Sequence, residues 1–164
     1  SLMNAVPAPS LTGYSLVTAG NATVAASADG VAAALSSAAL VGGGDYTLLV
    51  YGAPAAPQAV MLADDNTLPQ VASQARLRLV NGLADTTVAT SMRLDFVAVA
   101  EGVAQGAASA YANVDNTTGS QLDVSAGAAA VVSLTNRDLL ANSTYTLFVV
   151  GPAAAATGIL RKDR

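Results

Sequence analysis

The sequence predicts an all-β protein made of two tandem immunoglobulin-like β-sandwich domains, the first of which lacks its N-terminal strands. Three observations lead to this prediction. The chain contains an internal repeat, its second half alternates apolar and polar residues with a period of two, and Gly, Asn and Asp separate the alternating segments. Repeats indicate duplicated structural units, alternation indicates half-buried strands, and frequent turns are typical of sandwiches.

The repeat is clearest in two strand-like segments. Residues 46–52 read YTLLVYG and residues 145–151 read YTLFVVG. Each is followed by an Ala/Pro-rich turn and then by a short apolar segment ending in an acid, 60–65 in the first copy and 158–163 in the second. Tyr14 and Tyr111 stand at matching places upstream, so the chain holds two copies of one module.

The second copy supplies a full set of predicted strands. Its apolar residues alternate with charged ones, as in Arg76-Leu-Arg-Leu-Val80 and Met92-Arg-Leu-Asp-Phe96. Turn residues such as Asn81-Gly82 separate these segments. A seven-stranded sandwich is the expected architecture. The predicted strands are 76–81, 91–99, 109–115, 120–125, 130–135, 143–151 and 157–162.

The first copy is incomplete. It has no equivalents of the strands predicted at 76–81 and 91–99, and residues 1–12 are too short and too rich in proline to supply both. Two explanations stay open: a truncated or cleaved first domain, or a strand contributed by another chain, which would make a homo-oligomer through strand complementation. The alanine-rich run 31–40 also permits a helix, but the equivalent run 128–134 is rich in valine and favours strand.

Charge marks the expected domain boundary. Residues 1–63 contain only two charged side chains, Asp29 and Asp45, whereas the rest of the chain carries sixteen. The polar segment between the copies contains a proline, as linkers commonly do. We therefore expect a partial repeat over residues 1–65, a linker over 66–73, and a complete repeat over 74–164.

Composition excludes several kinds of chemistry. The 164 residues include no His and no Cys, only 11% are charged, and the net charge is -4. Thiol and imidazole catalysis are excluded, and the residues give no reason to expect a cofactor or a metal. Scattered basic residues disfavour nucleic acid as a partner, and the long uncharged stretches are too rich in Ala, Gly and Pro to predict a membrane span.

Acidic pairs are the remaining candidates for chemistry. Asp64 with Asp65 could supply oxygen ligands to calcium, but the spacing of a calcium loop is missing. Two other pairs could serve a glycosidase if they faced one cleft. These are Asp95 with Asp123 and Glu101 with Asp138. Acids on the outer face of alternating strands are usually solvated, so we expect the protein not to be an enzyme.

The five tyrosines are better explained by packing than by ligand binding. Four of them occupy positions that match between the copies, which favours core packing with each hydroxyl bonded to a backbone group at a sandwich corner. Tyr51 has Val150 as its counterpart, so it is the one tyrosine predicted as a surface contact.

Three segments carry a family resemblance: 75–81 (ARLRLVN), 102–111 and 145–151. Together they resemble the domain-of-unknown-function 4397 family, which occurs as tandem copies in exported bacterial proteins. The resemblance covers residues 75–164 and the later strands of 11–65. It implies a β-sandwich in the periplasm or at the cell surface of a bacterium, and it brings no catalytic or cofactor residues.

From these observations we expect a non-enzymatic, extracytoplasmic module of the cell envelope. It would act in structure, adhesion or protein interaction, with a protein or glycan as its partner. The alternative is a β-sandwich module that binds a small ligand or a carbohydrate through the loops at one end.

Overall fold

A computed structural model describes residues 3–22, 24–35 and 38–164, and it confirms the all-β class. No α-helix occurs in these residues, and the one helical turn is the 3-10 turn η1 at Ala153–Ala155. The described residues form no helix that is long and apolar enough to cross a membrane. Fifteen strands are assigned in this part of the chain: β1 Gly20–Ala22, β2 Ser27–Ala28, β3 Val31–Ala32, β4 Ala34–Leu35, β5 Ala38–Leu40, β6 Asp45–Tyr51, β7 Gln58–Asp64, β8 Gln74–Leu83, β9 Thr90–Leu94, β10 Val97–Val103, β11 Ala112–Asp115, β12 Thr117–Ala126, β13 Ala129–Leu139, β14 Ser143–Gly151 and β15 Thr157–Lys162.

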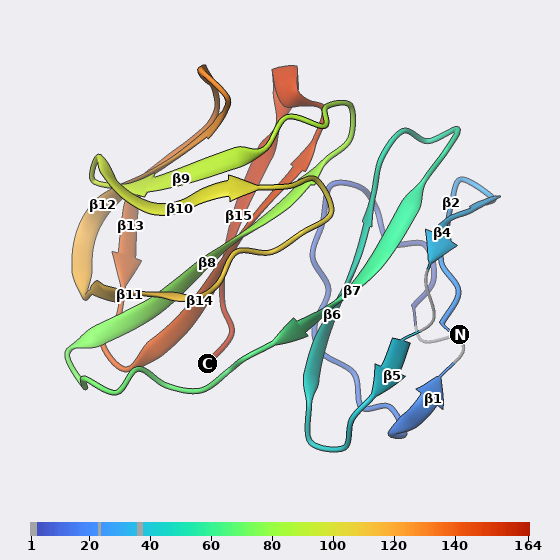
Figure 1. Cartoon of the computed structure of the whole chain (residues 1–164), viewed down its shortest axis with the longest axis horizontal. Helices are drawn as coiled ribbons and strands as arrows, with labels where there is room; N and C mark the ends of the chain where they lie inside the picture. Colours follow the sequence, from blue (N-terminus) through green and yellow to red (C-terminus); the bar gives the residue numbers. More distant parts are fainter. Residues whose placement is uncertain (1–2, 23, 36–37) are drawn as a thin grey trace.

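Residues 74–164 form two four-stranded sheets, visible at the left of Figure 1. One sheet has the order β10-β9-β12-β13 and the other β11-β8-β14-β15. Alternate side chains of both sheets fill the core between them. Leu77, Leu79, Met92, Leu122 and Leu147 are fully buried there. A β-sandwich is therefore present in the second half of the chain.

The strand predicted over 91–99 is in fact a hairpin. β9 and β10 pair antiparallel, and the chain reverses at Asp95 and Phe96, which have φ values of 46° and 72°. The Asp95 carboxylate accepts hydrogen bonds from the Gln121 amide and the Ser120 hydroxyl, which hold the turn. Because apolar-polar alternation continues through the reversal, the pattern gave no sign of a turn. Residues 74–164 consequently hold eight strands and not seven.

The first half of the chain has a smaller sheet of order β4-β7-β6, in which β6 and β7 form an antiparallel hairpin. Two further pairs, β1 with β5 and β2 with β3, accompany it. The described residues of the alanine-rich run 31–40 are all in strands except Ala33, so the helical alternative is wrong there. No strand is assigned between Asp64 and Gln74, the region expected to be a linker.

The β6–β7 hairpin packs on the outer face of the β8–β14 sheet, at the junction of the two halves in Figure 1. This contact explains the burial of β8 and β14. From Arg78 to Leu83 every residue of β8 is buried, as is every residue of β14 from Ser143 to Val149. A sheet with both faces covered is expected to show such continuous burial. The two halves of the chain thus share one interface.

Candidate functional site

The β6–β7 hairpin and the β8–β14 sheet meet through an apolar cluster that is built from equivalent residues of the two copies. Leu49 and Phe148 occupy the same repeat position and are both buried here, together with Val80 of β8. Half-buried residues surround them: Leu11, Tyr51, Val60, Leu62, Ala108, Val150 and Ile159. Matched faces of two equivalent hairpins therefore pack against each other.

A buried ion pair lies beside this cluster. The side chains of Arg78 and Asp64 are 2% and 0% exposed, and their guanidinium and carboxylate groups are in direct contact. Arg78 also donates to the Thr146 hydroxyl at 2.9 Å and to the Ala63 carbonyl at 3.1 Å. A buried charge is tolerated when it is paired and its remaining donors are satisfied. Arg78 therefore joins the second half of the chain to the first.

The polar groups around this pair also repeat. The Thr47 hydroxyl donates to Asp64 at 2.7 Å, and the Thr146 hydroxyl donates to Asp163 at 2.6 Å. Strand register explains the match, because Tyr46 faces Ala63 in one hairpin and Tyr145 faces Lys162 in the other. Asp64 is thus the counterpart of Asp163. The sequence alignment of the repeats, which matched Asp65 to Asp163, was wrong by one residue.

The matched tyrosines Tyr14 and Tyr111 complete the network. Tyr14 donates to Asp64 at 2.9 Å, and its ring lies under the Arg161 guanidinium, 4.3 Å from carbon to ring centre. The Tyr111 ring lies 4.7 Å from the guanidinium carbon of Arg78. Cations over aromatic rings are attracted by the ring quadrupole. Burial, with the nearby Asp64 charge, raises the pKa of Tyr14 to about 12.

The two aspartates differ in their ion pairs. Asp64 contacts the Arg78 guanidinium directly, whereas the one ion pair of Asp163 in the described part of the chain is with Arg161, at 3.6 Å. The Asp163 side chain is nevertheless only 2% exposed. Burial raises the pKa of this carboxyl above its ordinary value, because removal from water disfavours the charged form. The negative charge of Asp163 is therefore less well compensated than that of Asp64.

Tyr51, the predicted surface contact, lies half-buried in the apolar cluster between the halves of the chain. Its hydroxyl donates to Gln58 at 3.1 Å and rests against Gly106, where a Cβ would overlap it. The contact that the structure shows for Tyr51 is therefore internal.

The remaining tyrosines follow the packing prediction in part. The Tyr46 and Tyr145 hydroxyls accept the Val41 and Leu140 amides, at 2.9 and 3.0 Å, so the expected backbone partner is confirmed for this matched pair. The hydroxyls of Tyr14 and Tyr111 instead contact side chains, Asp64 and Thr146.

Apart from Glu101, which is exposed on β10, the other predicted acids are engaged in local hydrogen bonds. Asp123 accepts from Gln121 and Ser133, and Asp138 accepts the Gly119 amide. Asp65 pairs with Arg76 at 2.8 Å, and hydrogen bonds from Arg76 and Thr67 lower the pKa of its carboxyl. No cluster of three or more metal-ligating side chains occurs among the described residues.

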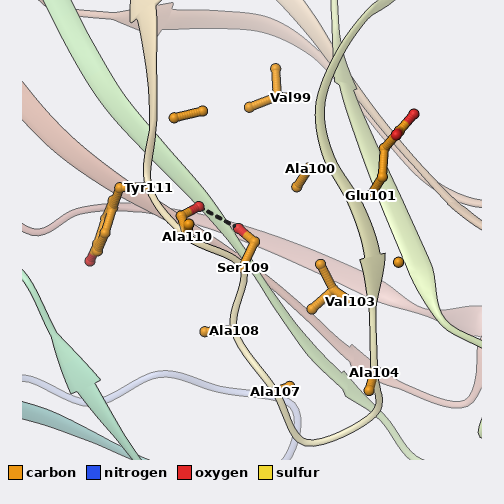
Figure 2. A pocket seen from close by; sticks show the side chains of 12 residues that line it. Val99, Ala100, Glu101, Val103, Ala104, Ala107, Ala108, Ser109, Ala110 and Tyr111 are labelled. Atoms are coloured by element: carbon orange, nitrogen blue, oxygen red, sulfur yellow. Dashed lines mark hydrogen bonds between the residues drawn. The ribbon is translucent and has the colours of Figure 1, made fainter.

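A shallow groove of about 510 Å³ lies between β10 and the segment that leads into β11. Most of its lining is small and apolar, and in Figure 2 Glu101 and Tyr111 point away from each other at opposite sides. The Ser109 hydroxyl at its floor is already bonded to the Leu79 amide and the Ala110 carbonyl. Ligand sites usually combine apolar walls with converging polar groups, and this groove lacks that convergence.

One edge of the β6 strand has no backbone partner in the described structure. Its counterpart β14 pairs with β15 on one side and, in parallel, with β8 on the other. β6 pairs only with β7, and no backbone hydrogen bond outside the strand ladders involves residues 45–51. The sequence predicted that the first copy lacks strands, and the open edge of β6 agrees with that prediction. The sequence did not predict that Arg78 is buried and pairs with Asp64, because alternation alone does not show that this face of β8 is covered. The position of Arg78 in the middle of β8 was the one available sign of its burial.

The fold and the site define an all-β protein whose polar centre joins two hairpins, one from each half of the chain. The chain belongs to the family described as Domain of unknown function (DUF4397), whose model matches residues 1–89. The match covers the first half of the chain and continues through β8, whereas the resemblance seen in the sequence covered residues 75–164 and the later strands of 11–65. No curated protein matches the chain.

Proposed function

We propose that the protein is a non-enzymatic, exported module of the bacterial cell envelope that works by binding another polypeptide. The unpaired edge of β6 is the observation that carries this proposal. An unpaired strand presents a row of backbone donors and acceptors that readily pair with a strand of another chain. A tandem immunoglobulin-like arrangement, as the sequence predicts, would leave the rest of the surface available for structural roles.

Exposed apolar side chains in the first part of the chain also support binding to another polypeptide. Of thirteen exposed large apolar residues in the described structure, eight lie within the first fifty positions. Apolar surface of this kind marks interaction sites when it gathers in one part of a protein. Those eight are Met3, Val6, Tyr14, Leu16, Val17, Val31, Val41 and Val50.

Photo-crosslinking in cells that encode the protein tests this function. A photoreactive residue at Val50, which lies on β6 and is 40% exposed, should join the chain to another polypeptide in the periplasmic or surface fraction. The same residue at Glu101, on the exposed part of β10, is the matched control. A cytoplasmic location, or equal crosslinking at both positions, would overturn the proposal.

A further inference from the structure

The missing neighbour of β6 has a defined chemistry because the same neighbour is present in the other copy. β8 runs parallel to β14, with Arg78 beside Thr146, Val80 beside Phe148 and Gly82 beside Val150. The β14 positions correspond to Thr47, Leu49 and Tyr51 of β6. A strand that pairs with β6 in this register would place Arg, Val and Gly on the face that meets the other half of the chain.

The apolar cluster is missing one residue of its repeat pattern. Its members pair between the copies as Leu49 with Phe148, Val60 with Ile159, Tyr51 with Val150 and Leu11 with Ala108, and Leu62 matches Arg161. Val80, fully buried at the centre, is the member with no counterpart in the first copy. A valine on an added strand would supply that counterpart.

The polar network is missing the corresponding arginine. Arg78 of the second copy reaches across the interface to Asp64 of the first. Because the two hairpins pack through matched faces, an arginine on a strand beside β6 would reach the other way, to Asp163. That carboxylate is buried and accepts the Thr146 hydroxyl, but its one ion pair in the described part of the chain is the long contact with Arg161. Arg161 now lies over the Tyr14 ring as Arg78 lies over that of Tyr111.

The segment that follows Tyr14 shows the effect of the missing strand. In the second copy, the residues after Tyr111 form β11, whose one partner among the strands that the structure describes is β8. The equivalent residues 15–18 form no strand, and Leu16 is fully exposed. An added strand would lie between this segment and β6 and could pair with both.

Resting on the function proposed above, we propose that the β6 edge binds, in parallel, an extended segment with the pattern Arg-x-Val-x-Gly, supplied by another polypeptide that carries the same repeat. Its arginine would pair with Asp163 and donate to Thr47, and its valine would enter the apolar cluster beside Val80. The bound strand would thereby complete the four-stranded sheet of the first copy.

A synthetic peptide with the sequence of residues 73–84 is the direct test. It should bind the intact chain saturably and slow hydrogen exchange at the amides of 46–50. A peptide with methionine in place of the arginine that corresponds to Arg78 should bind about tenfold more weakly, because a hydrogen bond to a charged group is lost. Asp163→Asn should weaken binding of the first peptide but leave that of the methionine peptide unchanged. Glu101→Gln is the matched control and should alter neither.

Several results would overturn the inference: no protection of β6, equal binding of both peptides, or binding that is indifferent to Asp163→Asn. If the peptide fails while crosslinking from Val50 persists in cells, the partner differs from a β8-like strand and the proposed function stands. If both experiments fail, the proposed function is wrong as well.

Discussion

Replacing Arg78 by methionine should destabilise the whole chain. The substitution keeps an apolar stem but removes the donors to Asp64, Thr146 and Ala63, and it leaves the Asp64 carboxylate buried with only Thr47 and Tyr14 as partners. Breaking a buried pair by removing one partner costs about 3–5 kcal/mol. For a chain of this size each kcal/mol lowers Tm by roughly 2–4 °C, so the expected fall is about 6–20 °C.

Urea unfolding followed by circular dichroism measures this cost, and Asp64→Leu in the same background provides the decisive comparison. The double variant Arg78→Met/Asp64→Leu should be more stable than Arg78→Met alone, because it leaves no unpaired buried charge. A loss below about 1 kcal/mol in Arg78→Met would refute the reasoning, since surface ion pairs contribute that little. So would a double variant whose loss is the sum of the two single losses.

The other predictions concern single contacts. Because the pKa of Tyr14 is raised from 10.0 to about 12, the folded state favours the protonated phenol, and this contribution to stability is lost as the pH rises through the higher value. Tyr14→Phe should flatten this alkaline loss of stability and remove the late-titrating phenol from the absorbance titration. Gly106→Ala should lower Tm, because φ is 75° there and a Cβ would overlap the Tyr51 hydroxyl, and Tyr51→Val should recover part of the loss; full stability of Gly106→Ala would contradict the packing. The raised pKa of Asp163 should make the protein lose stability as the pH rises from 3.8 through the raised value, because the folded state binds the proton more tightly; Asp163→Asn should abolish that slope in urea titrations.

Local patterns in the sequence were sufficient to predict several elements. β14 and β15 begin and end at the predicted residues, because each is bounded by turn residues and carries a strong apolar pattern. The hairpin at Asp95 could not be predicted in the same way. Its reversal depends on bonds to Gln121 and Ser120, which are distant in sequence.

The candidate site was harder to predict because it depends on pairing between the two copies. Alternation indicated that Arg78 and Leu79 point to opposite faces of β8, and they do. It could not show that the face carrying Arg78 is covered by another part of the chain. The sequence matched Asp65 instead of Asp64 to Asp163 for a related reason, because only strand register places each acid beside its threonine.

Phe148 of the second half is buried by the β6–β7 hairpin of the first half. The segment that is repeated in the sequence is therefore smaller than the segment that must fold together. A fragment cut at residue 74 would contain a whole repeat, yet it would present Val80 and Phe148 to water and leave Arg78 without its anion. The smallest fragment that denatures as one cooperative body should therefore include β6 and β7, and domain limits drawn from repeat boundaries alone would cut through a core.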